Sequence, residues 1–326
     1  MSSAVFDYQD MMISMSEIDT EDDTCSLNIG ADFEPLVSSI RDVGLTNPPV
    51  LRKREDLKYQ IVCGFRRVMA CKALGWRELK VRVLQGTYTE LDTLKLAILD
   101  NRSHRHLNTV EQARGIEKLS SILPKRNRLQ ALSSLLGFPQ NEKVIRKLEA
   151  LSRLSVAIQT GVTDGSVSFE AAVHLSEFSD EDALSFLNLF KRLKFSQSKQ
   201  REVVALVGEI AIREELQPGE VLRSKDIRTL LDHPELNQNE KGSKVRAYLK
   251  QRRFPALTRA EETFSRELRA LKLDEHMHWT APSYFEGGAH TLHITFKSIK
   301  DFEERRKSLD AIAKNPALRR LLAPPK

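Results

Sequence analysis

The chain has 326 residues, of which 40% are hydrophobic and 29% are charged, and its net charge at neutral pH is +6. This length allows two or three domains that each bury a core, and the composition is ordinary for a soluble protein. No apolar run reaches membrane-spanning length and no secretory signal opens the chain, so we expect a cytoplasmic protein and exclude membrane-anchored and secreted classes.

The first part of the chain predicts alternating strands and helices. The spacing of apolar residues indicates strands over 12–18, 59–63 and 79–84, an extended segment over 45–51, and helices over 34–43, 66–74 and 91–99. Elements that alternate in this order, with connections this short, form a small α/β unit.

The strand over 59–63 runs through Gly64 into a helix that begins with Arg66 and Arg67. Backbone N–H groups at such a helix start point into the turn and favour an anion. Two arginines there oppose the helix dipole, so we expect a negative group nearby. That group is either a phosphate or a carboxylate of the fold itself, and these residues alone leave both interpretations open.

A second polar cluster begins at Asp100. Asp100 and Asn101 offer oxygen ligands of the kind that Mg²⁺ takes together with phosphate oxygens and water. His104 and His106 lie two residues apart, a spacing that binds metal on a strand. No third ligand is evident beside them, so a histidine metal site is the less favoured interpretation.

Residues 126–154 predict two helices separated by a tight turn at Gly137, Phe138 and Pro139, which is the pattern of a helix-turn-helix. We assign five polar side chains to the outer face of the second helix: Gln140, Asn141, Lys143, Arg146 and Lys147. These residue types contact base edges and phosphates in DNA complexes. Similar hairpins are common in proteins that never bind DNA, so a purely structural role stays open.

The remaining helices predicted in this region lie over 110–123, 150–160, 168–175, 180–193 and 198–215. A polar stretch over 236–243 reads as a linker, and the basic residues that follow it could track a phosphate backbone or simply be solvated. The last part predicts a helix over 260–273, strands over 276–282 and 290–297, and a helix from 298 to 309. Because two strands alone are barely stable, we expect this part to pair with a second copy.

The charge distribution and the three cysteines bear on function as well. Nine acidic residues and no lysine or arginine lie between Asp7 and Glu34, whereas the later chain is basic, which suits a nucleic-acid partner. Cys25, Cys63 and Cys71 form no CxxC pair and are too few for a disulfide framework or a zinc site. We therefore expect buried thiols.

Three short boxes resemble the N-terminal domain of the ParB family of bacterial partition proteins, whose fold is shared with sulfiredoxin. Gly64-Phe65-Arg66-Arg67 is similar to the family's Gly-Glu-Arg-Arg box. Asp100-Asn101-Arg102-Ser103-His104 is similar to its Glu-Asn-x-x-Arg box, which ends on Arg105 if displaced by one. Leu107-Asn108-Thr109-Val110-Glu111 is similar to its Leu-Asn-Pro-Ile-Glu continuation. The likeness extends through the helix-turn-helix and the helix-strand-strand-helix tail.

The resemblance implies a multidomain α/β plus α protein. A ParB/sulfiredoxin-like α/β domain would occupy 1–108, a helical helix-turn-helix domain 109–235, a basic linker 236–256, and a small α+β dimerisation domain 257–326. In the family, the boxes hold CTP and Mg²⁺, and nucleotide binding turns a DNA-loaded dimer into a sliding clamp. Carried over by position, the resemblance implies nucleotide contacts from Gly64, Arg66, Arg67, Asn101 and Arg105.

The same resemblance places Asn101 near the metal and Asp100 where the family has its hydrolysis-linked glutamate. Phe65 stands where the family's first box is acidic, so any CTP hydrolysis is expected to be weak. The implied partners are double-stranded DNA, a second copy of the chain through 257–326 and a partner ATPase, with a nucleoid-associated location and no membrane.

Two other functions are compatible with the sequence. One is a transcription regulator that ignores nucleotides and uses the α/β domain as a protein-interaction platform. The other is an enzyme of the same fold, either a nuclease or a sulfiredoxin-like phosphotransferase. The phosphotransferase needs a reactive cysteine, and Cys63, at the end of a strand, is better explained as a core residue.

Overall fold

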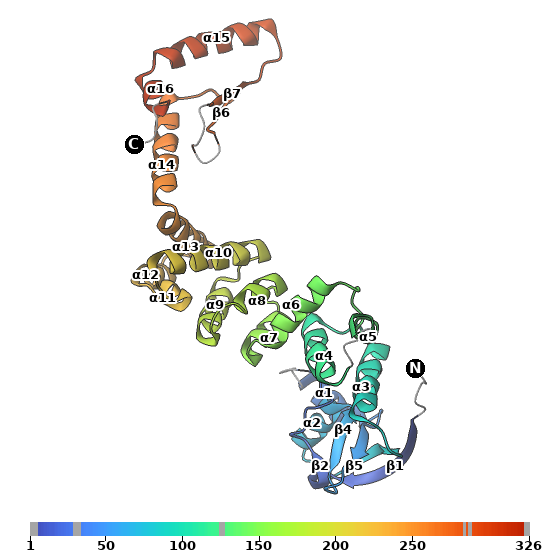
Figure 1. The fold of residues 1–326 in the computed structure, drawn as a ribbon. Coiled ribbons are helices and arrows are strands. Elements are labelled where there is room, and N and C mark those ends of the chain that lie inside the picture. Colours follow the sequence, from blue (N-terminus) through green and yellow to red (C-terminus); the bar gives the residue numbers. More distant parts are fainter. Residues whose placement is uncertain (1–5, 29–33, 124–127, 283–284, 286–288, 323–326) are drawn as a thin grey trace. The chain divides into compact units, whose positions relative to one another are not determined.

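The computed structural model describes residues 6–28, 34–123, 128–282, 285 and 289–322 (Figure 1). The chain divides into two compact units, Met1–Val204 and Ala205–Lys326, and each has buried residues of its own. Within the described residues, no helix combines the length and the apolar character that a bilayer crossing requires.

The first unit opens with a five-stranded sheet in the order β1-β5-β3-β4-β2. The strands are β1 (Asp7–Ser14), β2 (Ile18–Asp19), β3 (Val50–Lys53), β4 (Tyr59–Cys63) and β5 (Glu78–Gln85). The sheet is mixed, since β3 runs parallel to β5 and antiparallel to β4, and β1 is an antiparallel edge strand on β5. All five residues of β4 are buried, so β4 is a strand with both faces covered.

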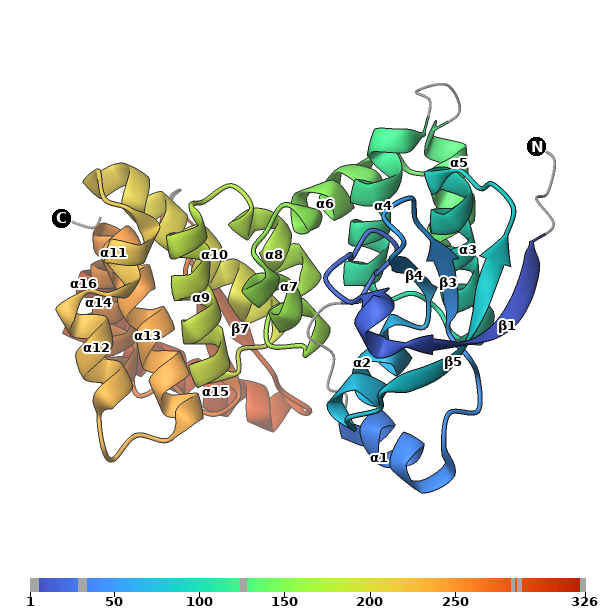
Figure 2. The same ribbon diagram turned by 90° about the horizontal axis from the view of Figure 1, so that it is seen from below.

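Helices cover both faces of this sheet (Figure 2). One core contains Ile61 and Val81 together with apolar residues of α1 (Glu34–Val43) and α2 (Phe65–Ala73). A smaller core on the other side contains Val62 and residues of α3 (Glu90–His104). Because neighbouring residues of a strand point to opposite faces, Ile61 and Val62 enter different cores. The predicted small α/β unit is confirmed.

In the described part of the chain, the helices from α3 to the end of the first unit are α4 (Thr109–Ile122), α5 (Arg128–Leu136), α6 (Glu142–Ser152), α7 (Val156–Thr163), α8 (Phe169–Leu175), α9 (Asp180–Leu193) and α10 (Gln197–Glu214). The second unit begins within α10. Its other elements are α11 (Pro218–Leu222), α12 (Lys225–Asp232), α13 (Gln238–Arg253), α14 (Pro255–Leu271), β6 (Met277–Thr280), β7 (Thr291–Ile294), α15 (Ile299–Lys314) and α16 (Pro316–Leu321).

Some predicted elements need correction. The stretch predicted as a linker, 236–256, is mostly the helix α13. A capping box starts this helix: the Glu240 backbone N–H donates to the Asn237 side chain, and the Asn237 backbone N–H donates to the Glu240 carboxylate. The helix predicted over 150–160 is wrong. The chain ends α6 at Ser152 and starts α7 at Val156.

The acidic N-terminal stretch is not simply a solvated surface. Asp19 and Asp22 both contact Arg54, and Asp22 also accepts from the buried Gln60 side chain at 2.8 Å. Partial burial alone would raise the pKa of Asp22. Hydrogen bonds from Thr24 and Gln60, together with the charge of Arg54, outweigh this effect, so the pKa of Asp22 lies below its usual value. Later basic residues therefore neutralise part of this stretch within the fold.

Candidate functional site

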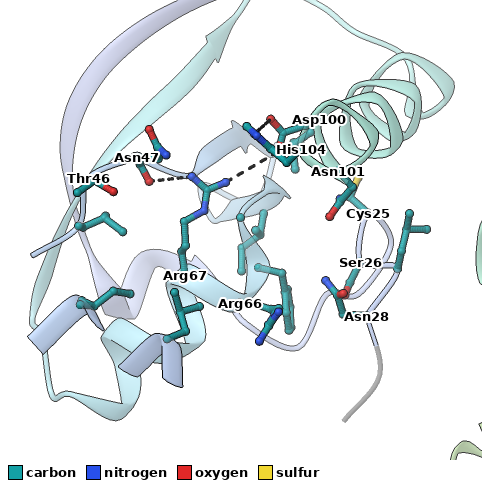
Figure 3. A pocket seen from close by; sticks show the side chains of 18 of the residues that line it. Cys25, Ser26, Asn28, Thr46, Asn47, Arg66, Arg67, Asp100, Asn101 and His104 are labelled. Atoms are coloured by element: carbon teal, nitrogen blue, oxygen red, sulfur yellow. Dashed lines mark hydrogen bonds and ion pairs between the residues drawn. The ribbon is translucent and has the colours of Figure 1, made fainter. Parts of the chain in front are cut away.

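The first unit contains a cavity of about 400 Å³ at the corner between β4, α2 and the end of α3 (Figure 3). This volume lies in the range of small-ligand sites. Its lining includes the predicted residues of both polar boxes: Gly64, Arg66, Arg67, Asp100, Asn101, His104 and Arg105. Two segments that lie far apart in the sequence are thereby brought to one cavity.

Gly64 is the N-cap of α2 and has a left-handed backbone with φ 87°. A Cβ atom built on it would lie 2.9 Å from the guanidinium of Arg67. The positive φ therefore favours glycine here, and a side chain at this position would also displace the guanidinium of Arg67 from its present place. The strand, the glycine and the helix together aim the start of α2 into the cavity.

Arg67 folds back across this corner, and its side chain is 24% exposed. One guanidinium nitrogen donates to the carbonyl of Asn47 at 2.8 Å, and the other lies 3.8 Å from the Asp100 carboxylate. At 3.8 Å the Arg67 guanidinium and the Asp100 carboxylate form an ion pair, but they are too far apart for a hydrogen bond. The interpretation that a carboxylate of the fold compensates the arginines thus holds in part for Arg67, and Arg66 also borders the cavity (Figure 3).

The polar cluster at 100–104 belongs to the last turn of α3, which extends five residues past the predicted end at 99. Asn101 donates its amide N–H to the carbonyl of Ala97 at 2.8 Å, which leaves its side-chain oxygen to accept or to bind a metal. One carboxylate, one amide oxygen and the oxygens of a phosphate make a donor set that Mg²⁺ accepts. Asp100 and Asn101 therefore fit the predicted magnesium site.

A histidine metal site has less support. His104 borders the cavity, with Nε2 3.9 Å from the Asp100 carboxylate, and His106 is exposed. Across the described part of the chain, no three or more His, Cys, Asp or Glu side chains gather closely enough to hold a metal ion.

Arg105 reaches the rim of the cavity, but its guanidinium is committed to Glu111. The two nitrogens lie 2.6 Å and 2.5 Å from the two carboxylate oxygens, and Glu111 is nearly buried. These hydrogen bonds raise the pKa of Arg105. The predicted nucleotide contact from Arg105 would therefore require this pair to rearrange.

Two other walls of the cavity lie outside the two polar boxes, although by resemblance Thr24-Cys25-Ser26-Leu27 stands roughly where the family has a Gln-Pro-Arg segment. One is the loop containing Cys25, Ser26, Leu27 and Asn28, and the other includes Thr46 and Asn47. The first loop is held by α4, because Arg114 donates to the Asn28 carbonyl at 3.2 Å and to Asp23 at 2.8 Å, while Lys118 donates to the Asp23 carbonyl at 2.7 Å. Neither wall shows the hydrophobic periodicity that predicts a helix or a strand. The prolines after Asn47 indicate only an extended segment there.

All three cysteines are buried, as predicted. Cys63 is 3% exposed, and burial together with the nearby Asp100 carboxylate raises the pKa of its thiol. Burial raises the pKa of Cys25 to about 11. A reactive thiol needs a lowered pKa and access to solvent, so the described geometry argues against a cysteine-based phosphotransferase.

The predicted helix-turn-helix segment contains α5, a turn at Gly137 with φ 77°, and α6. Lys143 and Arg146 are exposed on α6, whereas Lys147 pairs with Glu170 of α8 at 2.7 Å. Two predicted positions need correction. Asn141 is the N-cap of α6 and Gln140 precedes it, so neither lies on the outer face of the helix.

Comparison with known proteins gives the following matches. The ParB N-terminal domain family matches residues 10–102. The nucleoid occlusion protein of Bacillus mycoides is 30% identical over 201 residues, which cover 60% of this chain and 67% of that protein. The nucleoid occlusion protein of Oceanobacillus iheyensis is 28% identical over 204 residues, covering 61% and 68%.

Among solved structures, C-terminally truncated ParB from Caulobacter crescentus, complexed with CTP-gamma-S, is similar with a TM-score of 0.27 and 20% identity, covering 56% of this chain and 98% of that one. The domain match includes the first polar box and the start of the second, Asp100 to Arg102, and the match to the Bacillus mycoides protein is longer than that domain. The chain belongs to the ParB family.

Proposed function

We propose that this chain is a dimeric DNA-binding protein whose cavity binds CTP with Mg²⁺ and whose nucleotide state controls its hold on DNA. The observation that carries the proposal is the meeting of Gly64, Arg66 and Arg67 with Asp100 and Asn101 around one cavity. The family resemblance supports CTP as the nucleotide, and the geometry of the cavity supports these residues as its site.

A triphosphate suits the electrostatics of this corner. The helix start favours an anion, and Arg67 holds Asp100 only at 3.8 Å, a weak contact that a phosphate can replace with true hydrogen bonds. A bound Mg²⁺ would neutralise part of the phosphate charge, with Asn101 as a ligand and Asp100 beside it. Residue 65, which is acidic in the family's first box, is phenylalanine in this chain. Its side chain packs partly against the core and offers no acidic group to the cavity. We therefore propose slow hydrolysis at most.

The DNA partner is proposed from the helix-turn-helix of α5 and α6. Lys143 and Arg146 project from α6 into solvent, as groups that contact phosphates or bases must. Lys143 also lies beside the start of the helix, where recognition helices often read base edges. DNA binding through these side chains stays a prediction.

The second copy is proposed to bind through 257–326. The sheet of β6 and β7 has two strands, and Phe296, Ile299 and Phe302 are 52%, 80% and 48% exposed beside it. Such a small sheet and such exposed apolar side chains are stabilised when a partner covers them. A partner ATPase, as the resemblance implies, is retained as a proposal.

Calorimetry with CTP, ATP and GTP in Mg²⁺ tests the nucleotide proposal. The native protein is expected to bind CTP alone, and Arg67→Ala to lose at least about tenfold in affinity, since a charged hydrogen bond is worth roughly 1.5–3 kcal/mol. Arg41→Ala is the matched control, because Arg41 is an exposed cation of α1 outside the cavity lining. Equal loss in both variants would contradict the assignment of the site.

A second function is favoured if the native protein ignores all three nucleotides with and without DNA. The chain would then be a DNA-binding regulator in which Phe65 marks an altered pocket and the α/β domain binds other proteins. Partition, nucleoid occlusion and gene control are distinguished by where the protein binds on the chromosome. Mapping its bound DNA in cells decides among these three.

A further inference from the structure

Arg102 connects the cavity to the proposed DNA-binding hairpin. It directly follows Asn101 in the last turn of α3, but its side chain points to α5 instead of the cavity. One guanidinium nitrogen donates to the carbonyls of Ser134 and Leu135 at 2.5 Å and 2.8 Å. These residues are 32 and 33 positions away in the sequence, in the last turn of α5.

The last carbonyls of a helix have no partner within the helix, so they depend on outside donors. Arg102 from α3 supplies donors for two of them, and Gln112 from α4 donates to the carbonyl of Leu136 at 3.4 Å. A cation at this end also favours the helix dipole. The C-terminal end of α5 is therefore held by side chains from the helices next to the cavity.

Gly137 makes this contact close. It has φ 77°, and a Cβ built on it would lie 3.1–3.2 Å from the guanidinium of Arg102. The planar guanidinium thus packs against the backbone of the turn that leads from α5 to α6. If Arg102 is displaced, either its hydrogen bonds to the end of α5 are lost or this turn is displaced with it.

The last turn of α3 is also the part of the cavity wall that a ligand would contact. Asp100 and Asn101 line the cavity, and the backbone bond that closes the turn, from the Arg105 N–H to the Asn101 carbonyl, is 3.3 Å long. A ligand that draws the backbone of Asp100 or Asn101 toward it would also shift Arg102, which follows them directly on the same helical turn.

We propose that Arg102 is a positioning residue that couples occupation of the cavity to the placement of α5, and hence to DNA binding by the hairpin. This inference rests on the proposed function. By linkage, whatever factor CTP applies to DNA affinity, DNA applies to CTP affinity.

The test measures CTP affinity by calorimetry with and without saturating DNA, using the tightest-binding duplex selected by the native protein from a random pool. In the native protein we expect the two affinities to differ at least about fivefold, the lower range of known couplings. In Arg102→Gln we expect the ratio to fall within about twofold of one, while CTP affinity without DNA stays within about threefold of native. Arg102→Lys keeps the charge and a donor but loses the planar guanidinium that lies against Gly137, and its ratio is expected to lie between those of the native protein and Arg102→Gln.

Lys95→Gln is the control, because Lys95 lies two turns earlier on α3 and, among the described contacts, makes no hydrogen bond to α5. An unchanged ratio in Arg102→Gln overturns this inference and leaves the proposed function intact. The inference is also overturned, with the proposed function intact, if the native protein binds CTP and DNA but its CTP affinity is the same with and without DNA. Native protein that binds no nucleotide overturns both.

Hydrogen exchange on the native protein gives a second measurement that needs no variant. CTP is expected to change exchange of the amides in 134–138, at the end of α5, as well as in the cavity loops. Protection confined to the cavity, with exchange in 134–138 unchanged, would also overturn the coupling. This result is independent of whether Arg102→Gln folds.

Discussion

Arg105 and Glu111 form a two-pronged ion pair that closes the turn between α3 and α4. Glu111 also accepts the backbone N–H of Asn108 at 2.9 Å, so one nearly buried carboxylate holds the end of one helix and the start of the next. Arg105→Ala would leave this carboxylate without its cation, and we expect a loss of about 1–3 kcal/mol in the free energy of unfolding.

Urea unfolding followed by Trp76 fluorescence measures this loss, in a Trp279→Phe background so that the signal comes from the first unit alone. Glu111→Gln keeps an acceptor for Asn108 and should cost less than Arg105→Ala. Equal midpoints for native protein and Arg105→Ala would show that the pair contributes nothing to stability.

Under the proposed function, Asp100 would compete with a phosphate for Arg67. Replacing it by asparagine removes a negative charge 3.8 Å from the guanidinium. A unit charge at about 4 Å is worth about 1 kcal/mol in water, so CTP affinity measured in EDTA should rise about fivefold in Asp100→Asn. Any CTP hydrolysis measured with Mg²⁺ should disappear. Weaker binding in EDTA would contradict this placement of Asp100.

Lys143 and Arg146 should contribute more to DNA binding than Lys147, because Glu170 already holds Lys147 at 2.7 Å. We expect alanine at Lys143 or Arg146 to weaken binding and to reduce the slope of log affinity against log salt by about one each. Fluorescence anisotropy over a salt series measures both effects. Lys191→Ala, on α9, should change neither the DNA affinity nor the salt slope. If its effect were as large as that of Lys143→Ala, the loss would reflect the net charge of the protein and not a contact made by α6.

We expect Glu214 to make the stability of the second unit sensitive to acid. Hydrogen bonds from Arg252 and Arg213, against a smaller effect of burial, lower the pKa of Glu214, and the Arg252 contact joins α10 to α13. Because the folded pKa lies below the unfolded value of about 4.3, the stabilisation is present above that pH and is lost as pH falls through the folded pKa.

Urea unfolding of a Trp76→Phe protein, followed by Trp279, should therefore show stability that declines below about pH 4.3. Glu214→Gln should be less stable at neutral pH and should flatten this decline. Identical pH profiles for the two proteins would mean that Glu214 does not contribute.

The cysteines offer a test against thiol chemistry. Because Cys25, Cys63 and Cys71 are each at most 4% exposed and burial raises the pKa of each, a disulfide reagent at pH 8 should label none of them at the rate of a free thiol. All three should react after denaturation. Rapid labelling of Cys63 in the folded protein would restore the enzyme hypothesis.

Much of the fold follows from local signals. The bounds of α1, β4 and α9 agree with the sequence prediction, and α9 shows why: Ser179 caps its start, acidic residues fill its first turn, and Lys194 leaves it in a left-handed conformation. The end of α3 was misjudged because Arg105 ends it in an extended conformation without a glycine. A helix that ends in this way has no glycine or proline near its last residue to mark the end in the sequence.

The cavity was predictable only where it is made of motifs. Its two boxes are local patterns, but its loop walls depend on contacts between distant residues, such as Arg114 with Asn28. The direction of Arg102 is likewise set by α5 and not by its neighbours in sequence. Helical spacing places such a side chain on a face but says nothing about which distant element occupies that face.

Asp23 is bound by Arg114 and Lys118, which follow it by 91 and 95 residues. During synthesis on a ribosome, the loop at Asp23 emerges long before α4 exists to hold it. The wall of the cavity therefore cannot close until α4 has left the ribosome and folded. A fragment cut to the family match, residues 10–102, would lack both cations and hence the contacts that hold this wall of the cavity.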